Sequence, residues 1–482
     1  MLEKRDFYIN GEWVSPVTAK DHEVIDPSTE EPCAVISLAS EADVDKAVAA
    51  AKAAFPDWMM TPVEERIALV EKFLAIYKER AEDIAQAVTM EMGAPIDLAR
   101  SSQWGAGYSH TKNFLAAAKN FEWIKPLGDH APDTMIVHEA VGVCALITPW
   151  NWPLNQISLK VIAAAIAGCT MILKPSEESP LDAMIFAECM DAAGFPKGVF
   201  NLVNGDGATA GARLTSHPDV DMVSFTGSTR AGIAISKSAA ETLKRVHLEL
   251  GGKGANIIFA DADEKAVKRG VMSMMNNSGQ SCNAPSRMLV QRDIYPQAVE
   301  AAKAAAEQVT VGNAHEEGRH IGPVVNAAQW EKIQGLIQKG IDEGATLIAG
   351  GLGRPEHLNR GFFVKPTVFA DANNQMTIAR EEIFGPVLTM IPFDTEEEAI
   401  EIANDTVYGL TNYVQTQDGA KANRVAKRVR SGMVEMNGKS RGAGAPFGGM
   451  KQSGNGREAG VWGIEDFLEV KAVGGWALDA AE

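Results

Sequence analysis

Hydrophobic and polar positions alternate regularly from residue 143 onward, where short apolar runs are separated by segments of helical spacing. The runs predict strands at 143–147, 170–173, 199–203, 222–225 and 246–250. The segments between them predict helices at 154–167, 181–193, 208–216 and 231–243. Strands joined by such crossovers form an open parallel sheet with helices on both faces, which binds ligands beyond the carboxyl ends of its strands.

The pattern restarts after Gly251-Gly252-Lys253. Further strands are expected at 257–259, 288–290 and 387–393, and helices at 266–277, 296–309, 327–343 and after Thr395. This repetition favours a second α/β domain. The glycine pair is then a hinge, and a cleft at the hinge receives loops from both domains.

The first 120 residues are mostly helical after a short β-like entry. Ser40 and Asp43 are placed to cap a helix that continues to Phe55. The tetrapeptide Thr61-Pro62-Val63-Glu64 predicts a second helix start, because it combines a capping threonine with proline at the first helical position.

Composition excludes several classes of protein. The 482 residues correspond to two or three domains, and 46% hydrophobic with 22% charged residues is typical of a globular chain. The net charge of −18 has the wrong sign for binding nucleic-acid phosphates or an anionic membrane surface. The apolar run between Lys160 and Lys174 is shorter than the roughly 20 residues that span a bilayer. Residues 1–7 carry no secretory signal, so a cytoplasmic location is expected.

Cysteine and histidine spacing argues against disulfides and metals. The five cysteines are scattered without C-x-x-C spacing, and no H-x-x-x-H pair occurs, so we expect no disulfide framework and no metal. Cys144 and Cys169 lie in apolar runs, which is typical of inert buried thiols. Cys282 lies in the polar loop N-S-G-Q-S-C-N, which is typical of an accessible nucleophile.

Loops after the predicted strands carry candidate chemistry. In T-P-W-N-W-P (148–153), two prolines fix a turn that presents the Asn151 amide, as an oxyanion donor requires; the alternative is an ordinary helix entry with packing tryptophans. In K-P-S-E (174–177), the carboxylate suits ribose hydroxyls and repels a 2′-phosphate; the alternative is a solvated loop. The segment 205–211 misses G-x-G-x-x-G by one residue, and F-T-G-S (225–228) opens a helix whose amino end suits a pyrophosphate.

Glu249 is a carboxylate on an apolar strand beside the expected hinge. Burial there raises the pKa of a carboxyl group and suits it to general-base catalysis. The alternative is an ion pair with a lysine or arginine.

Seven motifs follow one another along the chain: T-P-W-N-W-P, K-P-S-E, F-T-G-S, L-E-L-G-G-K, G-Q-S-C, E-E-I-F-G-P and P-F-G-G-M-K-Q-S-G. In this order they resemble the NAD(P)-dependent aldehyde dehydrogenase superfamily from Tyr8 to Val470. The resemblance implies an α/β fold with a Rossmann-type parallel-sheet NAD-binding domain, a second α/β catalytic domain and a small β oligomerisation extension. The implied boundaries are 1–119 with 141–251, 252–462, and 120–140 with 463–482, and the implied assembly is a homodimer or homotetramer.

The resemblance also implies catalytic roles. Cys282 attacks the aldehyde carbon, and the Asn151 amide with the Cys282 backbone N–H holds the oxyanion of the thiohemiacetal. Hydride leaves for the nicotinamide ring, and Glu249 activates the water that hydrolyses the thioester to a carboxylic acid. Lys160 and Glu458 match a family pair that relays the proton of this base outward. The residues' own chemistry indicates the same nucleophile, oxyanion donor and base.

The implied cofactor site lies along the loops of the first sheet. The resemblance places Lys174 and Glu177 at the adenine ribose, Ser228 and Trp150 at the pyrophosphate, and Glu382 with Phe384 at the nicotinamide ribose. The Glu177 carboxylate favours NAD over NADP. The remaining expected contacts are Ile147, Gly207, Gly211, Phe225, Gly227 and Leu250. The glycine turn at 205 is itself interpreted as a tight turn, because the family binds dinucleotides without the usual glycine pattern.

The expected substrate pocket is polar and is lined by Trp152, Asn155, Leu159, Asn276, Ser281 and Asn283. This lining favours a small-molecule aldehyde with an oxo group, a hydroxyl or a ring heteroatom, such as a substituted aromatic or terpenoid aldehyde. One alternative is transfer of the acyl group to coenzyme A, against which Glu249 argues. Another is a structural or binding protein of the same fold, against which the joint presence of Cys282, Glu249 and Asn151 argues.

Overall fold

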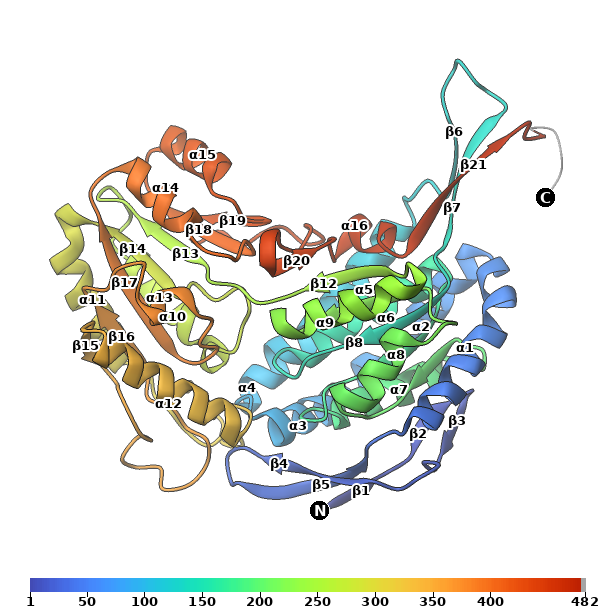
Figure 1. Cartoon of the computed structure of the whole chain (residues 1–482), viewed down its shortest axis with the longest axis horizontal. Helices are drawn as coiled ribbons and strands as arrows, with labels where there is room; N and C mark the ends of the chain where they lie inside the picture. Colours follow the sequence, from blue (N-terminus) through green and yellow to red (C-terminus); the bar gives the residue numbers. More distant parts are fainter. Residues whose placement is uncertain (478–482) are drawn as a thin grey trace.

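Two large β-sheets with helices on both faces lie side by side in the computed structural model, which describes residues 1–477 (Figure 1). The described residues also form two separate three-stranded sheets. One contains β1 (Leu2–Lys4), β4 (Asp21–Asp26) and β5 (Glu31–Ser37), and the other projects from the body as an arm.

The first large sheet has eight strands in the order β20-β12-β11-β8-β9-β10-β2-β3. Strands β8 to β12 run parallel, which confirms the predicted sheet, and β20, β2 and β3 add antiparallel edges. The order reverses between β8 and β11, so the carboxyl ends of these two strands flank a ligand-binding switch point. The strands are β2 (Phe7–Ile9), β3 (Glu12–Val14), β8 (Val143–Ile147), β9 (Thr170–Lys174), β10 (Phe200–Leu202), β11 (Met222–Thr226), β12 (Arg245–Glu249) and β20 (Gly454–Asn455).

Side chains of β8 alternate between the two faces of this sheet. Cys144 and Leu146 pack into the core beneath α6 and α7, whereas Ala145 and Ile147 pack into the core beneath α1. Every residue of β8, β9 and β11 is buried. Helices on both faces therefore explain why these strands are continuous apolar runs.

Of the two helix caps predicted in the first half of the chain, one is confirmed and the other is wrong. The Ser40 side chain accepts a hydrogen bond from the Asp43 backbone N–H, and the Asp43 side chain accepts one from Ser40. Thr61 does not cap α2, because α1 continues to Met60 and the Thr61 hydroxyl donates to the Asp57 carbonyl. The helices are α1 (Glu41–Met60), α2 (Val63–Glu79), α3 (Ala81–Met92), α4 (Ile96–Leu98), α5 (Trp104–Ala118), α6 (Pro153–Ala167), α7 (Leu181–Ala193), α8 (Ala212–Ser216) and α9 (Thr229–Ala239).

The second large sheet has seven strands in the order β15-β16-β17-β14-β13-β18-β19, all parallel except β15. The predicted strands correspond to β13, β14 and β17. The strands are β13 (Ala255–Ile258), β14 (Arg287–Gln291), β15 (Thr346–Ala349), β16 (Thr367–Ala370), β17 (Val387–Phe393), β18 (Thr411–Gln415) and β19 (Met433–Met436). The helices are α10 (Ala266–Met275), α11 (Tyr295–Glu307), α12 (Ala327–Asp342), α13 (Thr377–Arg380), α14 (Glu396–Asn404), which Thr395 caps as predicted, and α15 (Gly419–Arg428).

The arm consists of β6 (Ile124–Pro126), β7 (Thr134–Ala140) and β21 (Leu468–Gly474) (Figure 1). Strands β7 and β21 pair antiparallel along their full lengths, which unites two segments far apart in the sequence. Residues 478–482 of the expected extension lie outside the described residues.

The segment 445–458 connects the two large sheets. Its strand β20 pairs with β12, and the Ser453 hydroxyl donates to the carbonyl of Gly251 at 2.6 Å. The helix α16 (Gly460–Glu465) that follows packs against α5 and α6. Strand β20 follows the predicted hinge in the sequence but belongs to the first sheet. The sheets alone therefore do not divide the chain into domains, and the predicted domain boundaries stay predictions.

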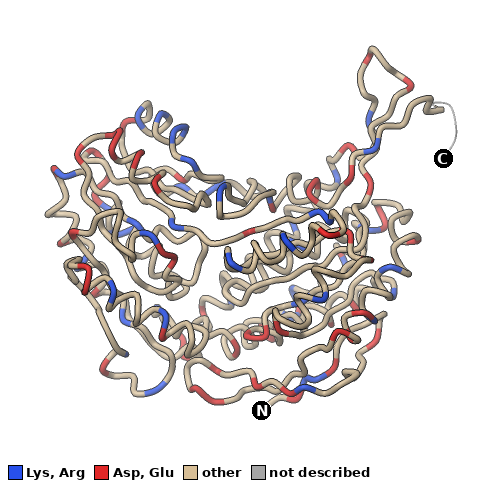
Figure 2. The backbone as a smooth tube through the Cα atoms, viewed as in Figure 1, with Lys and Arg blue, Asp and Glu red and all other residues tan. Residues whose placement is uncertain are grey.

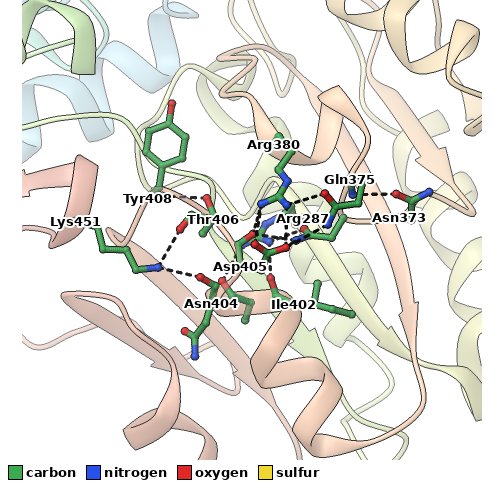
Figure 3. A network of polar contacts seen from close by, with 12 residues as sticks. Arg287, Asn373, Gln375, Arg380, Ile402, Asn404, Asp405, Thr406, Tyr408 and Lys451 are labelled. Atoms are coloured by element: carbon green, nitrogen blue, oxygen red, sulfur yellow. Dashed lines mark hydrogen bonds and ion pairs between the residues drawn. The ribbon is translucent and has the colours of Figure 1, made fainter.

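A network of polar contacts around Arg287 and Arg380 stabilises the end of α14, where Lys451 binds (Figure 3). The Lys451 ammonium donates to the two main-chain carbonyls that flank Asp405, at 2.9 and 3.0 Å. Arg380 forms an ion pair with Asp405 at 2.9 Å, and the fully buried Arg287 donates to the last carbonyls of α14. The segment 445–458 is thus attached both to β12 of the first sheet and to the chain at the end of α14.

Basic and acidic residues are interspersed along the described chain (Figure 2). Within residues 1–477, no helix has both the length and the apolar character needed to cross a membrane.

Candidate active site

Cys282 lies in a loop whose backbone reverses direction just before it. Asn277 and Ser278 have φ values of 50° and 56°, and Gly279 follows at 72°. A Cβ on Gly279 would lie 2.1 Å from a carbonyl oxygen of the E-E-I-F-G-P loop. A Cβ on Gly252 would lie 2.3 Å from the Cys282 carbonyl oxygen. Glycines therefore allow the motif loops to pack directly on the cysteine loop.

Cys282 lies where two cavities meet, because this residue lines both. The first cavity, of about 210 Å³, is bounded by the loops after β8, β11 and β12. The second, of about 560 Å³, is bounded by α5, α6, the cysteine loop and residues 441–447. The first cavity lies at the switch point of the parallel sheet, where a dinucleotide is expected.

The Cys282 thiol is half-buried, and burial raises its pKa well above the ordinary value. The carboxylates of Glu382 and Glu249 raise this pKa further. The resting sulfur is therefore a neutral thiol, and it needs a proton acceptor before it can act as a nucleophile.

Asn151 is held against the cysteine loop. Its side-chain amide nitrogen donates to the carbonyl of Gln280 at 2.9 Å, and its backbone carbonyl accepts from the side chains of Gln103 and Asn277. The amide nitrogen carries two hydrogens, of which the described residues use one. Asn151 and Cys282 both line the first cavity, so the second hydrogen is available to an oxyanion formed there.

Glu249 ends β12 and is 2% exposed. Burial raises its pKa to about 7, and the nearby Glu458 carboxylate adds to this, whereas His247 and Lys160 oppose it. Within residues 1–477, neither carboxylate oxygen accepts a hydrogen bond. Glu249 is thus a buried carboxyl group that can take up a proton near neutral pH in the same cavity as Cys282.

Lys160 and Glu458 form a buried ion pair. Lys160 lies on α6, and its ammonium is 2.5 Å from a carboxylate oxygen of Glu458. Both side chains are almost fully excluded from solvent. Neither residue lines the two cavities, and their contact with Glu249 is electrostatic.

The expected cofactor residues form two groups. Those that line the first cavity are Trp150, Gly227, Ser228, Leu250, Glu382 and Phe384. Trp150 and Phe384 meet edge to face with ring centroids 5.5 Å apart. The Glu382 carboxylate accepts a hydrogen bond from the Gly252 backbone at 2.8 Å. The exposed Ser228 caps α9, which directs the amino end of that helix towards the cavity.

The second group lies at the carboxyl ends of neighbouring strands, outside this cavity. Ile147 pairs with Lys174 on one side and with Phe225 on the other. Lys174 donates to the carbonyls of Pro175 and Gly205, and its ammonium is 3.7 Å from Glu177. Gly207 and Gly211 begin and end a π-helical turn that approaches the Lys174 side chain.

All six expected substrate residues line the second cavity, among them Asn155, Ser281 and Trp152. The Trp152 indole donates to the Ser281 hydroxyl at 2.7 Å, and Asn155 is hydrogen-bonded to His110 at 2.8 Å. The structure adds polar and aromatic residues that the sequence did not indicate, because α5 and the 441–447 segment reach this cavity only in the folded chain. They are Ser109, His110, Asn113, Tyr413, Arg441 and Phe447.

The family can now be decided by comparison. The model of the aldehyde dehydrogenase family matches residues 13–473. This chain belongs to the aldehyde dehydrogenase family. The resemblance and the fold class expected from the motifs are thereby confirmed, and the chain is an aldehyde-oxidising enzyme.

Relatives of this aldehyde dehydrogenase match it along almost their whole length. A Pseudomonas protein named 3-succinoylsemialdehyde-pyridine dehydrogenase is 51% identical over 478 residues, 99% of each chain. An aldehyde dehydrogenase structure from Bartonella henselae is 59% identical, covers 99% of this chain and 100% of its own, and has a TM-score of 0.98. A mutant aldehyde dehydrogenase C from Pseudomonas syringae, complexed with NAD⁺ and octanal, is 47% identical with coverages of 99% and 98% and a TM-score of 0.96.

The aldehyde dehydrogenase has a further contact that the sequence did not indicate. His247 lies on β12 two residues before Glu249, and its imidazole is 3.5 Å from the Glu249 carboxylate. On its other side the ring is hydrogen-bonded to Asp466 at the end of α16. The alternation of a strand places His247 and Glu249 on one face, whereas nothing in the local sequence indicates the contact with Asp466.

Proposed function

We propose that this enzyme oxidises an aldehyde to the carboxylic acid through a thioester on Cys282, with NAD as hydride acceptor. The observation that carries the proposal is the position of Cys282 where the two cavities meet, with Asn151 and Glu249 lining the first of them. One cavity suits the cofactor and the other the aldehyde, so the sulfur lies between them.

The first step begins at the Cys282 sulfur. The thiol releases its proton to solvent, and the sulfur attacks the aldehyde carbon to form a C–S bond. The aldehyde oxygen becomes an oxyanion, which the Asn151 amide and the Cys282 backbone N–H stabilise. One such donor contributes about 10² to 10³ in rate.

The cofactor, when bound, supplies a hydride acceptor for the carbon atom attached to sulfur. The first cavity fits this group: the amino end of α9 and Ser228 provide an anion site for a pyrophosphate, and Glu382 is a carboxylate suited to ribose hydroxyls. Loss of hydride leaves a thioester on Cys282. Glu249 then accepts a proton from water, and the water oxygen attacks the carbonyl. The C–S bond breaks to release the acid, and Glu249 returns its proton to the departing sulfur.

A preference for NAD over NADP is proposed from Glu177. This carboxylate stays partly exposed, at 32%, beside the buried Lys174, whose hydrogen bonds to two carbonyls leave it little freedom to bind a phosphate. Glu177→Gln removes the charge that repels a 2′-phosphate, so kcat/KM with NADP should rise on the order of tenfold. Initial rates with NAD and NADP measure the ratio; a higher kcat/KM with NADP in the unaltered enzyme contradicts the preference.

The substrate proposed is an aldehyde with a second polar group, such as an oxo group or a ring nitrogen. The second cavity presents amides, a histidine and Arg441. A relative is named for a semialdehyde attached to pyridine. Polar cavity groups favour a ligand that pairs with them and penalise one that leaves them unpaired. One solved neighbour is complexed with octanal, so the alternative substrate is a plain alkanal.

A panel of aliphatic, aromatic, terpenoid and oxo-bearing aldehydes tests the proposal, with reduced-cofactor absorbance as the readout for NAD and NADP. We expect oxo-bearing or heteroaromatic aldehydes to give the highest kcat/KM with NAD and the free acid as product. Plain long-chain alkanals preferred by tenfold or more contradict the substrate class. Acyl-CoA as product contradicts hydrolysis, and turnover by Cys282→Ala contradicts the nucleophile.

A further inference from the structure

The charged groups around Glu249 include one arrangement that the reaction as described does not use. His247 is 3% exposed, and both nitrogens of its ring face carboxylates. Nδ1 is hydrogen-bonded to Asp466, and Nε2 is 3.5 Å from Oε1 of Glu249. Asp466 itself is 21% exposed at its side chain, so the row of three side chains leads from the buried base to the surface.

This placement favours the doubly protonated, cationic ring. A neutral imidazole presents an N–H group to only one of two flanking carboxylates, whereas an imidazolium presents one to each and attracts both through its positive charge. Burial opposes the charge, but the contacts with Asp466 and Glu249 outweigh it and raise the pKa of His247 to about 10. The Glu458 carboxylate acts in the same direction.

The segment 445–458 closes over this pair of side chains. Gly456, at φ 79°, passes so close that a Cβ would lie 2.5 Å from Nδ1 of His247. Gly448, at φ 148°, does the same to Oε1 of Glu249, again at 2.5 Å. Both side chains are therefore confined, and the separation of 3.5 Å between them is fixed by backbone on two sides.

Charged groups from several elements surround Glu249. His247 pairs with Asp466, and Lys160 pairs with Glu458. Arg457 also lies beside Gly448, but its guanidinium donates to the carbonyls of Gly449 and Gly456. His247 and Lys160 lower the pKa of Glu249, whereas Glu458 raises it. Without His247, Glu249 would hold its proton more tightly, since burial and the like charge of Glu458 both disfavour its ionisation.

We propose that His247, locked in place by Asp466, is a positioning residue that keeps Glu249 ionised so that it can accept the proton of the hydrolytic water. His247 retains both its protons throughout and transfers none. The inference rests on the proposed role of Glu249 in hydrolysis of the Cys282 thioester.

The hydrolysis step can be observed separately with p-nitrophenyl acetate. The sulfur of Cys282 attacks the ester carbonyl, p-nitrophenolate leaves as a burst, and the slower steady rate reports hydrolysis of the acetyl thioester. The acylated thiol no longer titrates, so the acid limb of this steady rate follows Glu249. In the unaltered enzyme we expect the limb near pH 7, where Glu249 titrates.

His247→Gln should move the acid limb to higher pH by about one unit, which lowers the rate below the limb about tenfold with the burst retained. Asp466→Asn should move the limb in the same direction, because the ring loses the carboxylate that keeps it charged. If His247→Gln fails to fold, Asp466→Asn decides the question, since its partly exposed position tolerates an amide. A limb that coincides with that of the unaltered enzyme in a folded variant overturns the proposal.

His315→Gln is the matched control, because His315 pairs with Asp26 at 2.6 Å and lines neither of the two cavities. Its acid limb should stay in place. Glu249→Gln should abolish the limb. A limb that survives in Glu249→Gln, or a burst that survives in Cys282→Ala, overturns the proposed function, whereas an unshifted limb in His247→Gln and Asp466→Asn overturns only the role of His247.

Discussion

Glu91 and Asp182 are two buried carboxyl groups at the start of α7. The Glu91 carboxylate accepts hydrogen bonds from the backbone N–H groups of Leu181 and Asp182, at 2.6 and 2.9 Å, and so replaces the side-chain cap that Pro180 cannot provide. Burial raises the pKa of Glu91 to about 7 and that of Asp182 well above its ordinary range. The folded state therefore binds protons at this helix start that the unfolded chain releases.

The pH dependence of stability follows from the direction of these shifts. The folded pKa of Glu91 lies above its ordinary value of 4.5, so its contribution is complete below about pH 4.5 and is lost as the pH rises to about 7. Asp182→Asn removes one of the two carboxyl groups, so the loss of Tm between pH 5 and pH 8 should shrink by a few degrees. Thermal unfolding followed by circular dichroism measures this; an unchanged loss contradicts the account.

At the scale of elements, α6 and the 445–458 segment are joined by the ion pair of Lys160 and Glu458. The pair is almost fully buried, so each charge depends on the other for compensation. Lys160→Met leaves the buried Glu458 carboxylate without its cation. This should lower the free energy of unfolding by about 3 to 5 kcal/mol. The double variant Lys160→Met/Glu458→Leu should recover most of this loss. Denaturant unfolding measures both, and a double variant less stable than the single one contradicts the argument.

Strand β12 shows how far the sequence predicts the site. Its apolar run predicts the strand, and a carboxylate on it at the hinge points to Glu249 as a base. The spacing H-x-E also places His247 on the same face of the strand. Asp466 could not be found in this way, because it is brought to β12 by the fold of a helix 219 positions away.

The same distinction applies to the strands that the sequence missed. β15, β16, β18 and β19 have four or five residues each, and β15 is partly exposed. Such strands are specified by pairing with neighbours that are distant in sequence rather than by a local pattern. The central strands were predictable because burial on both faces makes them continuous apolar runs.

At the scale of the whole molecule, the arm carries the proposal of a homodimer or homotetramer. β21 is an edge strand of the arm, and its Val470 is 67% exposed. An exposed edge strand with apolar side chains is a surface suited to pairing with a second copy. Figure 1 shows the arm extending away from the body, where another subunit can reach it.

Val470→Lys should shift the mass in analytical ultracentrifugation from an oligomer towards the monomer, because a charge then lies in the interface. Val407→Lys is the control, since Val407 is also exposed, at 50%, but lies away from the arm. It should leave the mass unchanged. A monomeric unaltered enzyme, or an oligomer insensitive to Val470→Lys, contradicts this use of the arm.

The central claim is that the two cavities meet at a sulfur atom that carries the acyl group. Glu249→Gln should stop the reaction at the thioester, since no base remains to activate water. The variant is mixed with an accepted aldehyde and NAD, quenched in acid, digested and examined by mass spectrometry. The account predicts one reduced cofactor per active site and an acyl group on the peptide that contains Cys282. Reduced cofactor formed while the Cys282 peptide stays unmodified would contradict it.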